Sequence, residues 1–153
     1  MTSIENTRFK ADILYTMELP FGKIFLLEDV IVSEINDGVL FTAVEAKKVI
    51  TFAVAYYEKI NKAKKRVYIA NRINKYSVNP IGWIKLKDVI SIYLNAYCVV
   101  DDSSNGIMSA ILESKFVPIN FKSVSSFEEA LMWSKTFDSS FDERETKLIK
   151  KSS

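Results

Sequence analysis

The first long apolar region of the chain covers residues 13–35 and is rich in β-branched and aromatic side chains. It is interrupted by Pro20-Phe21-Gly22 and by Glu28-Asp29, and breaks of this kind separate short strands. Asn36-Asp37-Gly38 then provides a turn before the apolar residues 39–41. The pattern therefore predicts that the chain begins with successive short strands.

The apolar period changes to that of a helix after residue 41. Thr42 and Glu45 have the spacing of a capping box, which starts a helix. The apolar residues that recur at steps of three and four along this helix are Ala46, Val49, Ile50, Ala53, Tyr57 and Ile60. Residues 66–70 form the next predicted strand, parallel to the strand before the helix, so we expect one right-handed crossover unit.

The middle of the chain continues the alternation of strands and helices. A polar stretch at residues 71–82 precedes a short amphipathic segment at residues 84–93 and a buried strand at residues 96–100. Asp101-Asp102 and Ser103-Ser104 then predict the start of another helix. The residues expected on the buried face of that helix are Ile107, Ala110 and Ile111.

The last part of the chain predicts an edge strand and one more helix. Val117-Pro118-Ile119 favours a short edge strand, because proline cannot donate a hydrogen bond to a sheet. Ser125 with Glu128, or Ser126 with Glu129, forms a second capping box. The apolar face of this helix is expected to consist of Phe127, Ala130, Leu131, Trp133 and Phe137.

The composition suits one domain. The 153 residues, 48% of them hydrophobic, can bury one core, which we place in residues 1–137, with residues 138–153 as a polar, flexible tail. The N-terminal MTSIENTRFK lacks the apolar stretch of a secretory signal, and the longest apolar run, residues 49–57, is far shorter than the roughly 20 residues of a membrane span. The single cysteine, Cys98, suits a buried thiol in a reducing compartment. We therefore predict a cytoplasmic protein.

The chain lacks the residues that most enzyme reactions require. The chain has no histidine, one cysteine and four separated glycines, which excludes a Ser-His-Asp triad, a thiolate zinc site and the glycine-rich nucleotide fingerprints. We predict no enzyme activity, no cofactor and no metal. One alternative uses Asp101, Asp102 and Lys75 with a divalent ion. The simpler interpretation is that the two aspartates cap the helix that follows them. The net charge of +2 predicts no nucleic-acid partner.

The polar string YIANRINKYSVNP, residues 68–80, follows the predicted middle strand, where a partner can reach it. Arg72 offers a bidentate fork, and Tyr76 offers an amphipathic contact. An alternative stays open, in which Asn71 and Asn74 satisfy turn geometry while Arg72 packs its stem. The candidate partner-binding residues are Asn71, Arg72, Asn74, Lys75, Tyr76, Ser77 and Asn79.

The order of elements, with VLFTAVEA before the first helix, RVYIANR in the middle strand and CVVDD in a later strand, resembles the STAS fold. The strings YIANRINKYSVNP and PINFKSVSSFEEALMW are similar, more narrowly, to SpoIIAA-like uncharacterised bacterial proteins of the STAS/SEC14 type. The resemblance covers roughly residues 20–136 and implies a mixed sheet with helices packed against it. In anti-sigma-factor antagonists of this superfamily, a serine after the middle strand is phosphorylated and switches partner binding. The resemblance implies that role for Ser77.

Two functions are predicted from these features. The first is a non-enzymatic regulatory or protein-interaction module, which docks an unidentified protein through residues 71–80 and the helix after them. The alternative is a carrier of a small apolar or amphipathic ligand, held among Trp83, Tyr93 and neighbouring aliphatic side chains. The strand-rich first half has an exposed edge, which is also compatible with a homodimer.

Overall fold

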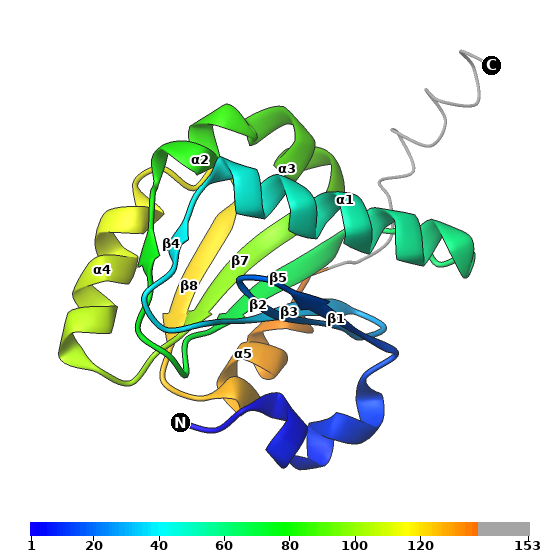
Figure 1. Ribbon diagram of the computed structural model, residues 1–153, viewed down its shortest axis with the longest axis horizontal. Helices are drawn as coiled ribbons and strands as arrows, with labels where there is room; N and C mark the ends of the chain where they lie inside the picture. Colours follow the sequence, from blue (N-terminus) through cyan, green and yellow to red (C-terminus); the bar gives the residue numbers. More distant parts are fainter. Residues whose placement is uncertain (138–153) are drawn as a thin grey trace.

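Figure 1 shows the computed structural model of the chain, of which residues 1–137 are described. Its main sheet has six strands in the order β1-β2-β3-β5-β7-β8, and β4 pairs with β6 in a separate two-stranded sheet. The first three strands are antiparallel neighbours, and each pair from β3 to β8 is parallel. The strands are β1 (Tyr15–Leu19), β2 (Gly22–Leu26), β3 (Val30–Ile35), β4 (Leu40–Phe41), β5 (Arg66–Asn71), β6 (Ser77–Val78), β7 (Leu94–Val100) and β8 (Asn120–Val124). The chain is thus an α/β protein, as the sequence predicts.

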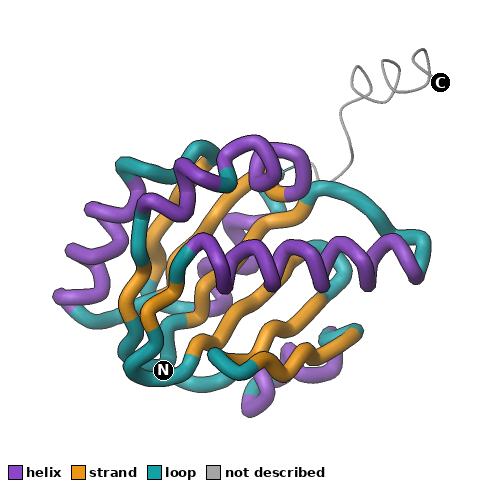
Figure 2. Tube along the Cα trace, turned by 45° about the horizontal axis from the view of Figure 1, so that its top comes forward, coloured by secondary structure: helices purple, strands orange, loops and turns teal. Residues whose placement is uncertain are grey.

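Helices cover both faces of this sheet, which makes three layers (Figures 1 and 2). The upper layer contains α1 (Ala43–Lys59), α2 (Ile81–Lys85), α3 (Lys87–Tyr93) and α4 (Ser104–Ser114). The lower layer contains α5 (Phe127–Ser134) and two short 3-10 helices, η1 (Ile4–Asn6) and η2 (Arg8–Asp12). The central strands are therefore buried on both sides, which explains their nearly continuous apolar sequences.

The predicted crossover unit is confirmed. Helix α1 begins after Thr42, whose backbone N–H donates to the Glu45 carboxylate over 3.0 Å while its hydroxyl accepts from the helix start. The strands on either side of the helix, β3 and β5, are parallel neighbours. The two residues before the capping Thr42 do not join the main sheet, because they form β4 and pair with β6. The predicted stripe is largely confirmed, with Val49, Ala53 and Tyr57 buried.

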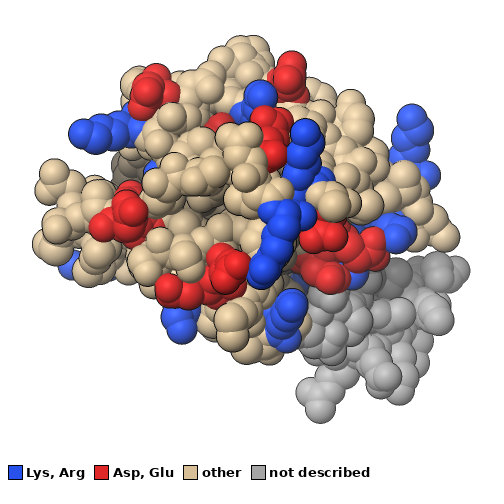
Figure 3. All heavy atoms as spheres, turned by 90° about the horizontal axis from the view of Figure 1, so that it is seen from below, with Lys and Arg blue, Asp and Glu red and all other residues tan. Residues whose placement is uncertain are grey.

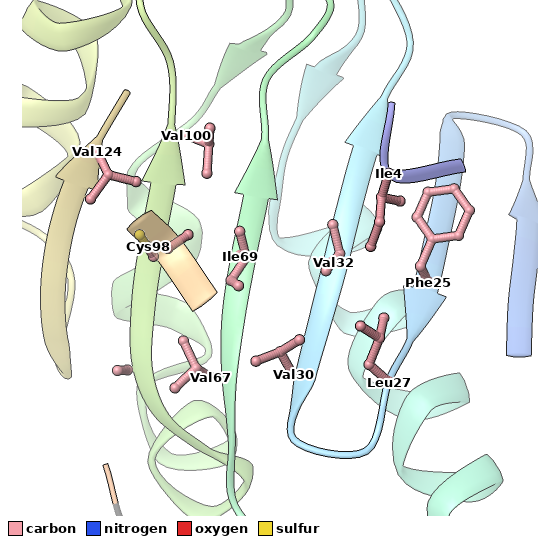
Figure 4. Packing of buried hydrophobic residues seen from close by; sticks show 12 residues of the cluster. Ile4, Phe25, Leu27, Val30, Val32, Val67, Ile69, Cys98, Val100 and Val124 are labelled. Atoms are coloured by element: carbon pink, nitrogen blue, oxygen red, sulfur yellow. The ribbon is translucent and has the colours of Figure 1, made fainter. Parts of the chain in front are cut away.

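The N-terminal segment forms part of the lower layer, which the sequence analysis did not anticipate. Ile4 has no exposed surface, and Phe9 and Ile13 pack beside it against the sheet. Figure 4 shows Ile4 beside Phe25 and Val32 in this core. The apolar face predicted for α5 is confirmed, since Ala130 is buried and its apolar neighbours pack against the same core. Of the two capping boxes considered, the helix uses Ser126, which accepts from the Glu129 N–H over 3.2 Å.

One predicted strand lies at the wrong place. The final strand begins at Asn120, after the predicted residues 117–119. Val117 and Ile119 instead pack their side chains against the apolar cluster under α4. The edge position itself is confirmed, because β8 pairs only with β7 in the main sheet.

The helices described in residues 1–137 include none that is long and apolar enough to cross a membrane. Within the same residues, no group of three His, Cys, Asp or Glu side chains could hold a metal ion. The tail predicted at residues 138–153 lies outside the described residues.

Candidate functional site

The loop after β5 turns its arginine toward the protein interior. Nη2 of Arg72 lies 2.5 Å from Oε2 of Glu113 on α4, and the two side chains are only 8% and 5% exposed. This ion pair connects two segments that are 41 residues apart in the sequence. Arg72, predicted as a partner-binding residue, therefore holds α4 against the sheet.

Aromatic side chains complete the hydrogen bonds of the Glu113 carboxylate. The Tyr97 hydroxyl donates to Oε1 over 2.8 Å, and the Trp83 indole N–H donates to the same oxygen over 3.0 Å. Arg72 also donates to the hydroxyls of Tyr97 and Tyr76, over 3.1 and 3.4 Å. A buried carboxylate needs partners of this kind, because an unpaired buried charge is strongly unfavourable.

The pKa values of Tyr97 and Arg72 in this network are both raised. Burial, together with the Glu113 charge, raises the pKa of Tyr97 well above its ordinary value of 10.0. Burial alone would lower the pKa of Arg72, but the surrounding tyrosines and the Glu113 carboxylate outweigh it and raise that pKa. Both shifts keep the Tyr97 hydroxyl protonated and the Arg72 guanidinium charged at neutral pH.

The other residues predicted in the loop divide between the interior and the surface. The Asn71 amide donates to buried Glu34 over 2.9 Å, and the Asn74 amide donates to the Ile35 carbonyl over 3.0 Å. Both bonds reach residues more than 30 positions away in the sequence, so they are not the local turn bonds of the alternative interpretation. The loop residues with exposed side chains are Lys75, Ser77 and Asn79.

Trp83 and Tyr93 do not share one cavity. Trp83 lines a cavity of about 50 Å³ between α1 and α2, whose polar lining includes Glu113. Tyr93 lines a second cavity of about 80 Å³, nearer the C-terminal end of α1. Ile50 and Leu94 line both cavities, so the two are neighbours beneath the same helix.

Helix α4 has an apolar face that points away from the sheet. The prediction that Ile107 and Ile111 are buried is wrong, because they are 42% and 48% exposed. Ala110 is buried as predicted, and the other buried residue of the helix is Glu113. The Glu113 pair with Arg72 sets this rotation, and the helix then presents its large aliphatic side chains outward. The apolar outer face of α4, as we call it below, consists of Ile107, Met108, Ile111 and Leu112 on the helix and of Phe116, two residues after its end.

The two aspartates before α4 lie at the helix start. Oδ1 of Asp101 accepts bonds from the N–H and the hydroxyl of Ser103, over 2.9 and 2.8 Å. Ser103 in turn accepts from the Gly106 N–H over 3.0 Å, which confirms the predicted serine cap. A side chain at Gly106 would place its Cβ against the Asp101 carboxylate, so it would displace that carboxylate from Ser103.

Glu113 is the important residue that sequence reasoning missed. One signal was present in the sequence, because Glu113 is the only charged residue within α4. A lone charge on an otherwise neutral helix is ordinarily assigned to the solvent side. Its partner in the loop after β5 becomes visible only in the folded chain.

Comparison of the chain with protein-family models, curated proteins and solved structures gives no match. The candidate site therefore rests on its geometry, and the resemblance to STAS proteins stays a prediction.

Proposed function

We propose that this chain is a non-enzymatic, STAS-like interaction module that docks a partner helix on the apolar outer face of α4. The observation that supports the proposal is the exposure of five large apolar side chains along this one segment. A helix that is apolar on both sides is ordinarily buried, and contiguous exposed apolar patches mark interaction sites. This surface replaces the loop at residues 71–80 as the main docking site.

The size of the face favours one partner helix over a stable dimer. From Ile107 to Leu112 the helical part of the face extends about 8 Å, at about 1.5 Å per helical residue, and Phe116 follows after the end of the helix. A stable interface of standard size uses about 20–30 residues on each side. Five side chains instead fit an amphipathic helix that lies along α4 in a transient complex.

The charges at the two ends of the face specify the partner further. Asp102 is exposed before the helix, and Lys115 is exposed after it. Between them, the outward side of α4 carries no charged side chain. The partner helix is therefore expected to carry an apolar stripe with a basic residue near Asp102 and an acidic residue near Lys115.

The loop after β5 contributes to this proposal as a support for α4. Its Arg72 fixes Glu113, and its exposed Ser77 remains the proposed phosphorylation site. A phosphate on Ser77 would add negative charge to a loop that connects directly to the Arg72 pair. Charged residues are mixed elsewhere, since Figure 3 shows lysines and arginines interspersed with acidic side chains on the lower face. This mixture supports a protein partner more than a nucleic-acid partner.

Photo-crosslinking in the cells that naturally express the protein tests the proposal. A photoreactive phenylalanine analogue at Met108 should form an adduct with a second protein, and Leu112→Glu should abolish the adduct. The matched control is Met132→Glu, which places the same charge at a 70%-exposed methionine on α5 and should leave the adduct intact. The crosslinked peptide should contain apolar residues at three- and four-residue steps.

Three outcomes would overturn this proposal. They are the absence of an adduct at Met108, an adduct that persists in Leu112→Glu, and an adduct with a second copy of the chain. The last outcome would support the predicted homodimer instead. A shift of the Ser77 peptide by the mass of one phosphate, absent in Ser77→Ala, would confirm the modification.

A further inference from the structure

A second candidate binding site lies beneath α1, separate from α4. Six of the eleven residues that line the 80 Å³ cavity are aliphatic, and the others are the cations Arg66 and Lys64, the carboxylate Glu58, and Tyr57 and Tyr93. The 50 Å³ cavity beside Trp83 adjoins it through the shared residues Ile50 and Leu94. The two cavities are therefore neighbours under the helix, the larger one lined by Arg66 and the smaller one by Trp83.

Arg66 is a buried cation without an ion-pair partner in residues 1–137. Only 2% of the surface of Arg66 is exposed. The guanidinium donates to the backbone carbonyls of Glu28, Lys64 and Lys62 over 2.8, 3.3 and 2.7 Å. These bonds use three of its five N–H groups. Two donors of a buried charge therefore remain available to an acceptor.

The carboxylates near Arg66 already pair with surface lysines. Glu28 pairs with Lys62 over 2.6 Å, and Asp29 pairs with Lys64 over the same distance. On its other side, the guanidinium stacks on the Tyr57 ring, with Cζ 3.3 Å from the ring centroid. The ring holds the guanidinium flat beside the cavity. Its charge is thus positioned but not neutralised by a bonded carboxylate.

We propose that the two cavities together bind a short amphipathic carboxylate, with its head group on Arg66 and its alkyl chain under α1 toward Trp83. An incoming carboxylate would accept the two remaining N–H groups and neutralise a charge that is unfavourable alone. Tyr93 lines the same cavity. The six aliphatic residues of the lining provide apolar surface for the alkyl chain, as in pockets for apolar ligands. The site does not depend on the proposed function of α4.

Titration of the full chain with a head-group series tests the proposal without altering the protein. The probes are octanoate, octanol and octylamine, with binding measured by calorimetry. Octanoate should bind at least ten times more tightly than octanol, because only the carboxylate pairs with Arg66, and octylamine should not bind. Equal binding of octanoate and octanol would overturn the role of Arg66, and absence of octanoate binding would overturn the site.

NMR of the two indole N–H groups tests the position of the alkyl chain. Octanoate should shift the Trp83 signal, whereas the Trp133 signal serves as an internal reference because Trp133 packs on the opposite face of the sheet. Trp133→Phe assigns the two signals. A Trp83 signal that stays unchanged at saturating octanoate would overturn the proposed position of the alkyl chain.

A cavity-filling variant provides a second location test. Val54 lines the larger cavity from α1, so Val54→Phe should weaken octanoate binding at least tenfold. The matched control is Thr51→Phe, at an exposed position of the same helix, which should bind octanoate as the wild type does. Equal octanoate affinity of the two variants would overturn the site.

Discussion

Two buried arginines stand at opposite ends of β5 and differ in how their charges are balanced. Arg72, directly after the strand, pairs with the Glu113 carboxylate over 2.5 Å. Arg66, the first residue of the strand, donates to three backbone carbonyls and stacks on Tyr57. The paired arginine connects α4 to the fold, whereas the unpaired one retains capacity for an anion. A buried arginine that is paired with a carboxylate therefore indicates a structural role, whereas a buried arginine without a carboxylate partner indicates a binding site for an anion.

The largest effect in this comparison is expected from Arg72→Met. The substitution leaves the Glu113 carboxylate buried without its cation, which should lower the free energy of unfolding by about 3–5 kcal/mol. Urea denaturation measures the change. Glu113→Gln and the double variant complete a mutant cycle, in which the double variant should lose clearly less than the sum of the single variants. Additive losses would show that the pair does not act as a unit.

Arg66→Met should destabilise the protein less, by about 2 kcal/mol, because hydrogen bonds are lost but no carboxylate is left unpaired. The same variant also tests whether Arg66 binds the carboxylate of octanoate. At ten times the dissociation constant, octanoate should stabilise the wild type by about 1.4 kcal/mol and Arg66→Met not at all. Thermal denaturation with and without octanoate measures both changes. Equal stabilisation of the two proteins would show that Arg66 does not hold the head group.

Alkaline pH provides an intermediate effect that leaves both arginines charged. Burial raises the pKa of the Cys98 thiol from 9.0 to about 12. Between these values the unfolded chain loses the proton while the folded chain keeps it, so stability falls as pH rises through this window. The loss should reach about 1.4 kcal/mol at pH 10.

Cys98→Ala removes this thiol titration while the buried tyrosines remain. The loss between pH 7 and pH 10, measured by urea denaturation, should therefore be smaller in the variant than in the wild type. Identical losses in the two proteins would assign the alkaline sensitivity to the tyrosines instead.

The smallest effect is expected on the outer face of α4. Ile111→Gln should change the free energy of unfolding by less than about 0.5 kcal/mol, because the side chain is already half exposed. Ala110→Leu, on the buried side of the same helix, should cost about 1–3 kcal/mol through overpacking. Urea denaturation of the two variants compares the faces. A large loss in Ile111→Gln would contradict the outward orientation of that side chain.

The strand and helix pattern was largely predictable from local sequence. The capping residues Thr42, Ser103 and Ser126 mark helix starts through bonds to residues two or three positions away. The strand predicted at residues 96–100 has a continuous apolar sequence, because both of its faces are buried, and this made it predictable. The short strands β4 and β6, of two residues each, offered no comparable local pattern.

The candidate sites were far less predictable. The rotation of α4 depends on a charge pair between Arg72 and Glu113, and that pair outweighs the aliphatic pattern that predicts Ile107 and Ile111 as buried. The role of Arg66 depends likewise on carbonyls of the preceding loops and on an aromatic ring of α1. Neither arrangement has a fixed spacing in the sequence.

The sequence by itself determined the α/β class, the crossover around α1 and the lack of histidine-based and multi-cysteine chemistry, because periodicity, capping and composition are local properties. Only the tertiary structure decided which polar side chains turn inward and which apolar side chains remain outside. The physical reason is that a buried charge must find its partner in space. The arginines at the two ends of β5 found different partners, and those partners set the orientation of α4 and the chemistry of the cavity beneath α1.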